Sequence, residues 1–216
     1  MELLEALRNT PTARRFSEEP VPDGVLHRVL DSARFAPSGG NRQGWRVIVI
    51  RDPATRRTLR DLYLEAWIPY LARARDALGP DPDPLRLRVI ERTDRFAQNL
   101  DKVPVHLLIA VDLRALTVTD KDLPRQSVVG GGSIYPFTHN ILLAARAESL
   151  AAALTTLIVP AEPHLREMFG IPAEFAVAAL IAIGWPAEPL GRRLNRKPVE
   201  EFTSLETFDG RPLTAG

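Results

Sequence analysis

The sequence predicts an α+β domain, because stretches with apolar residues at helical spacing alternate with short runs rich in β-branched residues. The order of these stretches follows no strict strand–helix–strand repeat, which favours α+β packing over a parallel α/β sheet. A length of 216 residues and a hydrophobic content of 45% suit one domain with a sizeable core. We therefore expect a single domain over residues 1–216, built from packed layers of helices and strands.

The N-terminal elements are two helices and a strand. Residues 1–10 carry charges in an apolar rhythm, which is typical of an amphipathic helix and not of a secretory signal. A second helix follows a proline-rich turn, with Asp23 placed as its N-terminal cap, and Pro37 stops it. Residues 45–51 are rich in β-branched side chains and predict a strand.

The middle of the chain predicts two helices joined by a proline-rich loop. Residues 56–77 have an apolar and a charged side, and Pro69 weakens the middle of this helix. Three prolines within residues 79–84 require a loop, which suggests a flap that covers another part of the protein. A polar helix then covers residues 85–100, and residues 105–112 predict a buried strand.

The C-terminal part predicts one central helix, two strands and a tail. Residues 133–149 are apolar on most sides, so we expect a helix buried all round. Strands are expected over 154–159 and 175–183, with a short helix over 162–169 between them. Residues 186–216 are rich in proline and arginine, Arg192 and Arg193 included, and cannot form a core alone. This tail must lie on another surface, either its own or that of a partner subunit.

Composition and motifs exclude several classes of function. The net charge of +1 provides no global field for nucleic acid, and no segment is long and apolar enough for a membrane span. The absence of cysteine removes thiolate chemistry and disulfides, and the four histidines lack ligand spacing, so we expect no metal site. No phosphate-binding GxxxxGK[ST] loop and no GxSxG elbow occur. We expect a soluble, cytoplasmic protein.

Two loops carry the residues best suited to a ligand. Residues 12–16 place arginines after the first helix, and residues 36–45 combine Ser38, Gly39 and Asn41 in a loop where glycines permit close approach. A ligand with many polar edges would suit such a loop. A plain turn at the end of a helix would use the same residue types, and Arg15 could be only a surface charge.

These loops and the motifs after them resemble the FMN-dependent nitroreductase family, and the resemblance extends over nearly the whole chain in the family's order. Each motif is weak alone, but so many in one fixed order rarely arise by chance. They are Arg14-Arg15-Phe16 with Val21-Pro22, residues 36–45, Ser133-Ile134-Tyr135-Pro136 with residues 140–147, Leu154-Thr155-Thr156, Phe169-Gly170-Ile171-Pro172, Ile183-Gly184-Trp185-Pro186 and Asn195-Arg196-Lys197-Pro198.

The resemblance implies a nitroreductase-like fold, with a central mixed antiparallel sheet flanked by helices. It also implies an interlocked homodimer with two FMN sites at the subunit interface. Residues 186–216 would then be a C-terminal extension that is exchanged and wraps the partner subunit. This agrees with the tail's need for an outside surface.

The resemblance also assigns cofactor-binding positions. Arg14 would lie near N1 and the C2 carbonyl of the flavin, where a cation stabilises the reduced state, and Arg196 would bind the phosphate. Leu154 to Thr156 would meet the N5 edge. The flavin does the chemistry, so no side chain is assigned a catalytic role. The full set of expected cofactor-binding residues is Thr12, Arg14, Arg15, Pro37, Ser38, Gly39, Asn41, Gln43, Leu154, Thr155, Thr156 and Arg196.

The implied activity is a ping-pong transfer of two electrons from NADPH or NADH, through FMN, to a small aromatic acceptor such as a nitro compound or a quinone. Nothing in the sequence decides between the two donors. A flap over residues 64–84 would set substrate choice through Trp67, Tyr70 and Arg73, although a helix that covers the core would use the same residues. Dehalogenation or dehydrogenation of a specific metabolite would use the same fold and flavin.

The chain departs from the family pattern at three places. Thr10-Pro11-Thr12 stands where many members carry Arg-Arg-Ser or Arg-His-Ser, so one phosphate cation is missing, although Thr12 could supply the hydroxyl. Gly44 replaces the usual proline before Trp45, which would loosen the loop. Residues 149–151 replace Gly-Leu-Gly and add side chains. These departures predict reduced affinity for FMN and leave open a degenerate member that sequesters flavin without efficient turnover.

Overall fold

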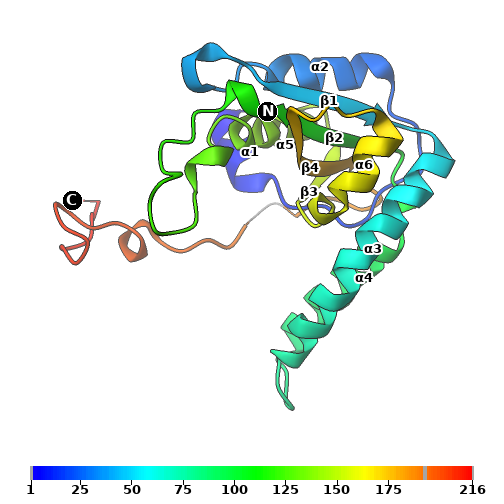
Figure 1. Cartoon of the computed structure of the whole chain (residues 1–216). Coiled ribbons are helices and arrows are strands. Elements are labelled where there is room, and N and C mark those ends of the chain that lie inside the picture. The colour runs from blue at the N-terminus through cyan, green and yellow to red at the C-terminus, as the bar shows by residue number, and fades with distance from the viewer. Residues whose placement is uncertain (1, 192–193, 216) are drawn as a thin grey trace.

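The computed structural model describes residues 2–191 and 194–215. One four-stranded sheet forms the centre, with the strand order β1-β2-β4-β3 and antiparallel pairing throughout the described strands. Helices cover both faces of this sheet, as the sequence predicted (Figure 1). The elements are α1 (Leu3–Asn9), α2 (Asp23–Ala33), β1 (Trp45–Ile50), α3 (Pro53–Asp76), α4 (Pro84–Gln98), β2 (Val105–Asp112), α5 (Tyr135–Ala147), β3 (Ala151–Thr155), α6 (Glu162–Phe169) and β4 (Phe175–Gly184).

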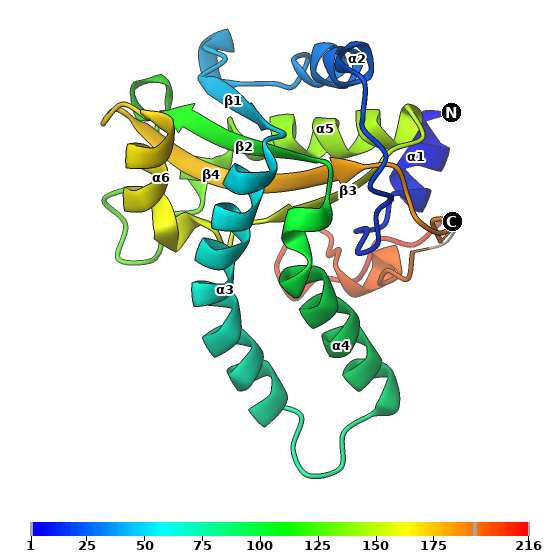
Figure 2. The same ribbon diagram turned by 90° about the vertical axis from the view of Figure 1, so that its right-hand side faces the viewer.

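The sheet separates two hydrophobic clusters. Along β2, Leu107 and Ile109 point into the cluster with α2 and α5, whereas Leu108 points into the cluster with α3 and α6. This alternation is the expected two-residue period of a strand with both faces buried. Figures 1 and 2 show the result: α2 and α5 lie on one face, and the long α3–α4 hairpin projects from the other.

The α3–α4 hairpin begins at two aspartate caps. The side chain of Asp52 accepts a hydrogen bond from the backbone N of Thr55 at 2.7 Å, and Asp83 caps α4 in the same way through the backbone N of Leu85. Pro69 does not interrupt α3, which continues from Pro53 to Asp76. Proline has no N–H, so Pro69 donates no hydrogen bond to the carbonyl oxygen of Glu65. Both residues are exposed, so water can donate to that oxygen instead.

Three local predictions were wrong. Asp23 is the first helical residue of α2 and not its cap, and its carboxylate instead accepts from Arg51 at 2.7 Å. The strand expected over residues 154–159 is β3, which covers Ala151–Thr155, because three small alanines fit the buried edge beside β4. The expected central helix is not buried all round in one chain: α5 buries Phe137 and Ile141 on one face, while its other face is only half-buried.

The turn from α5 into β3 has strained backbone at Ser149. Ser149 has φ of 62°, and the backbone N atoms of Ser149 and Leu150 donate to the carbonyls of Arg146 and Ala145 at 3.1 and 2.8 Å. These are the two bonds of a helix C-terminal Schellman turn, whose left-handed position favours glycine. The serine here therefore costs conformational energy that a glycine would not.

We expect Ser149→Gly to raise the free energy of unfolding by about 1 kcal/mol, because glycine adopts positive φ without steric cost. Urea unfolding followed by circular dichroism measures the change. The matched control is Gly170→Ser at the end of α6, where φ is 61° and nothing lies within 4 Å of an added Cβ. The free energy of unfolding of Gly170→Ser should fall by a similar amount. Equal stability of Ser149→Gly and the parent would contradict the strain argument.

The C-terminal tail leaves the body of the molecule after β4. It extends outward from the rest of the chain without joining the sheet (Figure 1), and Phe208 and Phe202 are 96% and 66% exposed. Apolar side chains at such exposure are unfavourable in water for an isolated chain. Arg192 and Arg193, named among the basic residues of the tail, lie outside the described residues.

The loop between β2 and α5 is held by one buried carboxylate. Asp120 accepts from the backbone N of Val128 at 2.9 Å, from Ser127 Oγ at 2.7 Å and from Arg125 at 2.8 Å. These contacts, that of Val128 above all, lower the pKa of Asp120 to about 2. The carboxylate is therefore charged, and holds this loop, at any pH well above 2.

Candidate functional site

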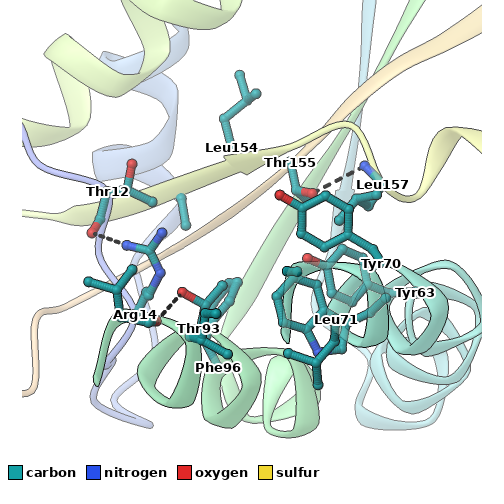
Figure 3. Close-up of a pocket in the computed structure, with 15 residues that line it drawn as sticks. Thr12, Arg14, Tyr63, Tyr70, Leu71, Thr93, Phe96, Leu154, Thr155 and Leu157 are labelled. Atoms are coloured by element: carbon teal, nitrogen blue, oxygen red, sulfur yellow. Dashed lines mark hydrogen bonds between the residues drawn. The ribbon is translucent and has the colours of Figure 1, made fainter. Parts of the chain in front are cut away.

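A cavity of about 320 Å³ opens between the N-terminal segment, β3 and the α3–α4 hairpin (Figure 3). Two backbone hydrogen bonds place the N-terminal segment along the sheet: Ala13 N donates to Ala152 O at 3.0 Å, and Ser17 N donates to Trp185 O at 2.8 Å. The cavity is thus bounded by parts of the chain that are far apart in sequence. Its lining consists of Thr12, Arg14, Tyr63, Trp67, Tyr70, Leu71, Ala74, Val89, Ile90, Thr93, Phe96, Ala153, Leu154, Thr155 and Leu157.

Aromatic rings from α3 form one wall of the cavity. Trp67 lies between Tyr63 and Tyr70, with ring centroids 6.2 and 5.5 Å away. The indole nitrogen of Trp67 donates to Asp94 of α4 at 2.8 Å, which fixes the ring and ties the two helices together. Planar walls of this kind suit a planar, largely apolar ligand.

Arg14 is the one cation among the lining residues. It is half-buried, and its Nη1 donates only weakly to the carbonyl oxygen of Thr12, at 3.4 Å. Burial lowers the pKa of Arg14 first, and the nearby charge of Arg92 lowers it further. Among the described residues no carboxylate pairs with Arg14. The cavity therefore presents a partly desolvated guanidinium that an electron-rich ligand atom can satisfy.

Tyr63 and Thr155 meet at another part of the cavity (Figure 3). Burial raises the pKa of Tyr63, and the hydroxyl of Thr155 and the positive charge of Arg14 oppose part of that shift. Thr155 Oγ1 also accepts from the backbone N of Leu157 at 3.2 Å, which holds the end of β3. Tyr63 is therefore a neutral hydroxyl, held close to β3.

The structure brings four of the expected cofactor residues together. Thr12, Arg14, Leu154 and Thr155 all line the cavity, on the N-terminal segment and β3. Thr156 follows directly but is exposed and is not part of the lining. Of the two neighbouring arginines only Arg14 enters the cavity. Arg15 forms an ion pair with Glu188 at 3.0 Å, and it lines an adjoining recess.

A second group of expected residues lies elsewhere in the same chain. Pro37, Ser38, Gly39, Asn41 and Gln43 lie in the loop after α2, while the α3–α4 hairpin projects from the opposite face of the sheet (Figure 2). Neither the cavity nor the two recesses that adjoin it at Arg14 are lined by any residue of this loop. The loop itself is well defined: Ser38 Oγ accepts from Gln43 N at 3.1 Å, and Gly39 N donates to Ser133 Oγ at 3.0 Å.

The expected phosphate ligand, Arg196, lies on the exposed tail. Its Nη1 donates to the carbonyl oxygen of the preceding Asn195 at 2.7 Å, which is a local contact. Within one chain Arg196 does not line the cavity. Its placement therefore depends on where the tail rests.

Gly44 does not loosen the loop, contrary to the sequence-based expectation. Its carbonyl accepts from Asp112 N at 2.8 Å, and a Cβ at this position would lie 2.5 Å from the Cβ of Ala115. The glycine is required by close packing at the start of β1, on the loop that carries Ser38 and Asn41.

We expect Gly44→Ala to destabilise the protein by about 1–3 kcal/mol, because the added methyl group collides with Ala115 and the loop must shift. Thermal unfolding measures this change. Gly24→Ala in α2 is the matched control: its Cβ would meet only a side-chain atom of Arg28 at 3.9 Å, so stability should rise slightly. A Gly44→Ala variant as stable as the parent would show that the loop yields freely.

Sequence reasoning missed several lining residues. Tyr63, Thr93 and Phe96 were interpreted as parts of helices only, and the cavity uses all three. Trp67 and Tyr70, which were considered for substrate contact, do line it, whereas Arg73 is exposed and does not. A tyrosine on the apolar face of a helix was the available signal, because its hydroxyl needs a partner.

No group of acidic or histidine side chains suited to a metal ion occurs among the residues that the structure describes. Nor does the described part of the chain contain a helix with the length and apolarity needed to cross a membrane.

Known proteins are similar to this chain in sequence and in fold. Residues 7–185 match the model of the nitroreductase family. A protein named NADH dehydrogenase from Thermus thermophilus is 30% identical over 196 residues, which are 87% of each chain. Iodotyrosine deiodinase 1 from Pongo abelii is 28% identical over 203 residues, which are 93% of this chain and 67% of the relative. A solved nitroreductase-type structure from Desulfovibrio desulfuricans, in complex with FMN, superposes with a TM-score of 0.66 at 25% identity and covers 96% of this chain and 98% of its own. Both the expected family and the expected fold are confirmed, and the chain belongs to the nitroreductase family.

Proposed function

We propose that this protein is an FMN-dependent oxidoreductase that transfers two electrons from NAD(P)H to an aromatic acceptor, such as a nitro compound or a quinone. Membership of the nitroreductase family supports a flavin-dependent oxidoreductase. The single observation that carries the proposal is Arg14, a half-buried cation without a carboxylate partner among the described residues, at the edge of an aromatic cavity. That combination fits a planar ring with one electron-rich edge.

The lining residues fit FMN at three points. The aromatic rings of Tyr63 and Trp67 suit the apolar faces of the isoalloxazine, and Arg14 suits its N1 and C2 carbonyl edge. Leu154 and Thr155 lie where the N5 edge would meet β3. Bound FMN would supply the two-electron chemistry, and the protein positions the donor and the acceptor in turn. The residues themselves stabilise charge, exclude water and orient the ring.

The site is completed by a second subunit in this proposal. The loop with Ser38 and Asn41 does not line the cavity of its own chain, and in a homodimer it would contribute to the flavin site of the partner. The exposed tail from residue 186 onward, with Phe208 96% exposed, would wrap that partner. Exposed side chains of α1, namely Leu3 and Leu4, add to the apolar surface that a dimer would cover.

An absorption titration tests the proposed function. FMN is added to the purified protein, the unbound flavin is removed, and NADPH and then NADH are added without oxygen. We expect the absorbance of oxidised flavin to be retained with the protein and to be bleached by at least one donor. Retained flavin that neither donor reduces would favour sequestration, and no retained flavin would refute the proposal.

We expect Arg196→Ala to weaken FMN binding by about 1.5–3 kcal/mol, because the variant removes a charge-assisted contact to the phosphate. Equilibrium dialysis of the apoprotein against FMN measures the change. Arg211→Ala, on the same tail, is the control and should bind FMN as the parent does. Unchanged FMN affinity in Arg196→Ala would remove Arg196 from the site.

Reductive dehalogenation of an aromatic metabolite is the second candidate. The likeness to iodotyrosine deiodinase 1 supports it, and the aromatic cavity would accept a phenol ring as readily as a nitroarene. Halide release measured beside nitro reduction, at equal flavin content, separates the two reactions.

A further inference from the structure

Two polar recesses adjoin the aromatic cavity, and both contain Arg14. One, of about 230 Å³, lies between the N-terminal segment, Arg92 of α4 and residues 188–191. The other, of about 270 Å³, is lined by Arg15, Arg95 and Lys102, among other residues. Arg14 is thus the point where an apolar chamber meets two charged ones.

The charge around these recesses is strongly one-sided. We call the five cations that line them the cationic rim: Arg14, Arg15, Arg92, Arg95 and Lys102. Glu188 is the single carboxylate in the two linings. It pairs with Arg15 at 3.0 Å and with Arg92 at 3.5 Å, and all three side chains are largely exposed. Arg95 makes no ion pair with any described residue.

The rim gathers positive charge locally in a chain whose net charge is only +1. On α4, Arg88, Arg92 and Arg95 follow at spacings of four and three, which places them on one face of the helix. Thr93 and Phe96 of the same helix line the aromatic cavity (Figure 3). A ligand that enters the cavity would therefore leave its outer part against the arginines of α4.

The phosphate of FMN alone does not account for so many cations. It carries a charge of about −2, and the proposed function already gives it Arg196. A nicotinamide dinucleotide brings a diphosphate to the cavity mouth, and its 2′-phosphorylated form adds about two further negative charges. Arginine binds such groups through its planar fork of donors.

We propose that the rim cations other than Arg14, namely Arg15, Arg92, Arg95 and Lys102, bind the phosphates of the electron donor and that the protein selects NADPH over NADH, with Arg92 and Arg95 as the residues that recognise the 2′-phosphate. This inference rests on the proposed function, because it names the donor for that same site. Glu188 holds Arg15 and Arg92 in place before the nucleotide arrives, and the phosphate takes over those contacts when it binds.

Calorimetric titration of the FMN-loaded protein with NADP⁺ and with NAD⁺ tests this directly, without turnover. We expect NADP⁺ to bind at least about tenfold more tightly, since it gains one or more charge-assisted contacts. Its affinity should also fall more steeply than that of NAD⁺ when salt is raised from about 50 to 300 mM.

Variants on α4 assign the effect to residues. Arg92→Gln and Arg95→Gln should each weaken NADP⁺ binding by about tenfold and leave NAD⁺ binding nearly unchanged. Arg86→Gln is the matched control, because Arg86 lies on the same helix but lines neither recess. Flavin content is read from the absorbance of each sample before titration.

Four outcomes would overturn the proposal: equal affinity for the two nucleotides, no binding of either, an equal effect of Arg86→Gln, or loss of FMN from Arg92→Gln and Arg95→Gln in place of weaker NADP⁺ binding. The last would assign the rim to the flavin phosphate. Failure of the parent protein to hold FMN at all is a different result, since it refutes the proposed function before any nucleotide is added.

Discussion

Replacement of Arg14 by glutamine is expected to lower kcat/KM for the nicotinamide donor by about 10²–10³-fold. Arg14 is the one cation that lines the aromatic cavity, and the pKa lowered by burial indicates that it is poorly solvated. A desolvated charge stabilises developing negative charge more strongly than one in water does. Glutamine keeps a hydrogen-bond donor of smaller reach but removes the charge.

Stopped-flow reduction of the bound flavin measures this effect, and the flavin reduction potential provides a second readout. The potential should fall by about 30 mV for each 1.4 kcal/mol of lost stabilisation in a two-electron couple. Arg86→Gln is the control, because Arg86 lines neither the cavity nor the two adjoining recesses and should leave both readouts unchanged. A normal potential in Arg14→Gln would separate Arg14 from the flavin ring.

Acidification is expected to destabilise the fold by about 4 kcal/mol between pH 6.5 and pH 3, through His106. His106 is 0% exposed within β2, and neither ring nitrogen has a hydrogen-bond partner among the described residues. Burial first, and the charge of Arg56 second, lower its pKa from 6.5 to about 3. The backbone of Leu100, which lies near the ring without forming a regular hydrogen bond, and the charge of Asp101 offset only part of this.

The sign of this pH dependence follows from which state of the protein, folded or unfolded, binds a proton on His106. The folded state keeps the imidazole neutral, whereas the unfolded chain takes up a proton below about pH 6.5. Stability is therefore full above pH 6.5 and is lost as the pH falls towards 3. Urea unfolding at a series of pH values measures this loss.

His106→Leu keeps a similar volume and removes the titrating group, so this variant should lose much less stability over the same pH interval. It should be at least as stable as the parent at pH 7, because two unpaired nitrogens leave the core. The exposed His27 provides the control variant, His27→Gln, which should follow the parent. Equal acid loss in the parent and in His106→Leu would assign the effect to other groups.

Regular elements with a strong local pattern could be predicted from the sequence. The predicted bounds of β2 and of α6 agree with the structure, and α3, α4 and β4 differ only at their ends. Packing decided the rest. Ala151 to Ala153 have low strand propensity, yet they form β3 because small side chains fit the edge of β4. Asp23 has the chemistry of a cap, but its ion pair with Arg51 draws it into another role.

The residues of the candidate site also fall into two groups: those that the sequence could select and those that only the fold brings in. The resemblance selected Thr12, Arg14, Leu154 and Thr155, and the fold places all four around one cavity. Tyr63 and the arginines of α4 could not be selected, because no local pattern reports what a helix faces. The α3–α4 hairpin brings them to the N-terminal segment from about 50 to 80 residues away in sequence.

The sequence by itself determined the α+β class, the nitroreductase family and the chemical types that gather at the site, since these depend on local periodicity and on motifs in a fixed order. The tertiary structure alone decided which residues share a cavity, that Gly44 is fixed by packing, that His106 is neutral, and that the Ser38 loop lies apart from Arg14 within one chain. Burial, desolvation and close approach are properties of neighbours in space, and the order of residues along a chain does not specify those neighbours.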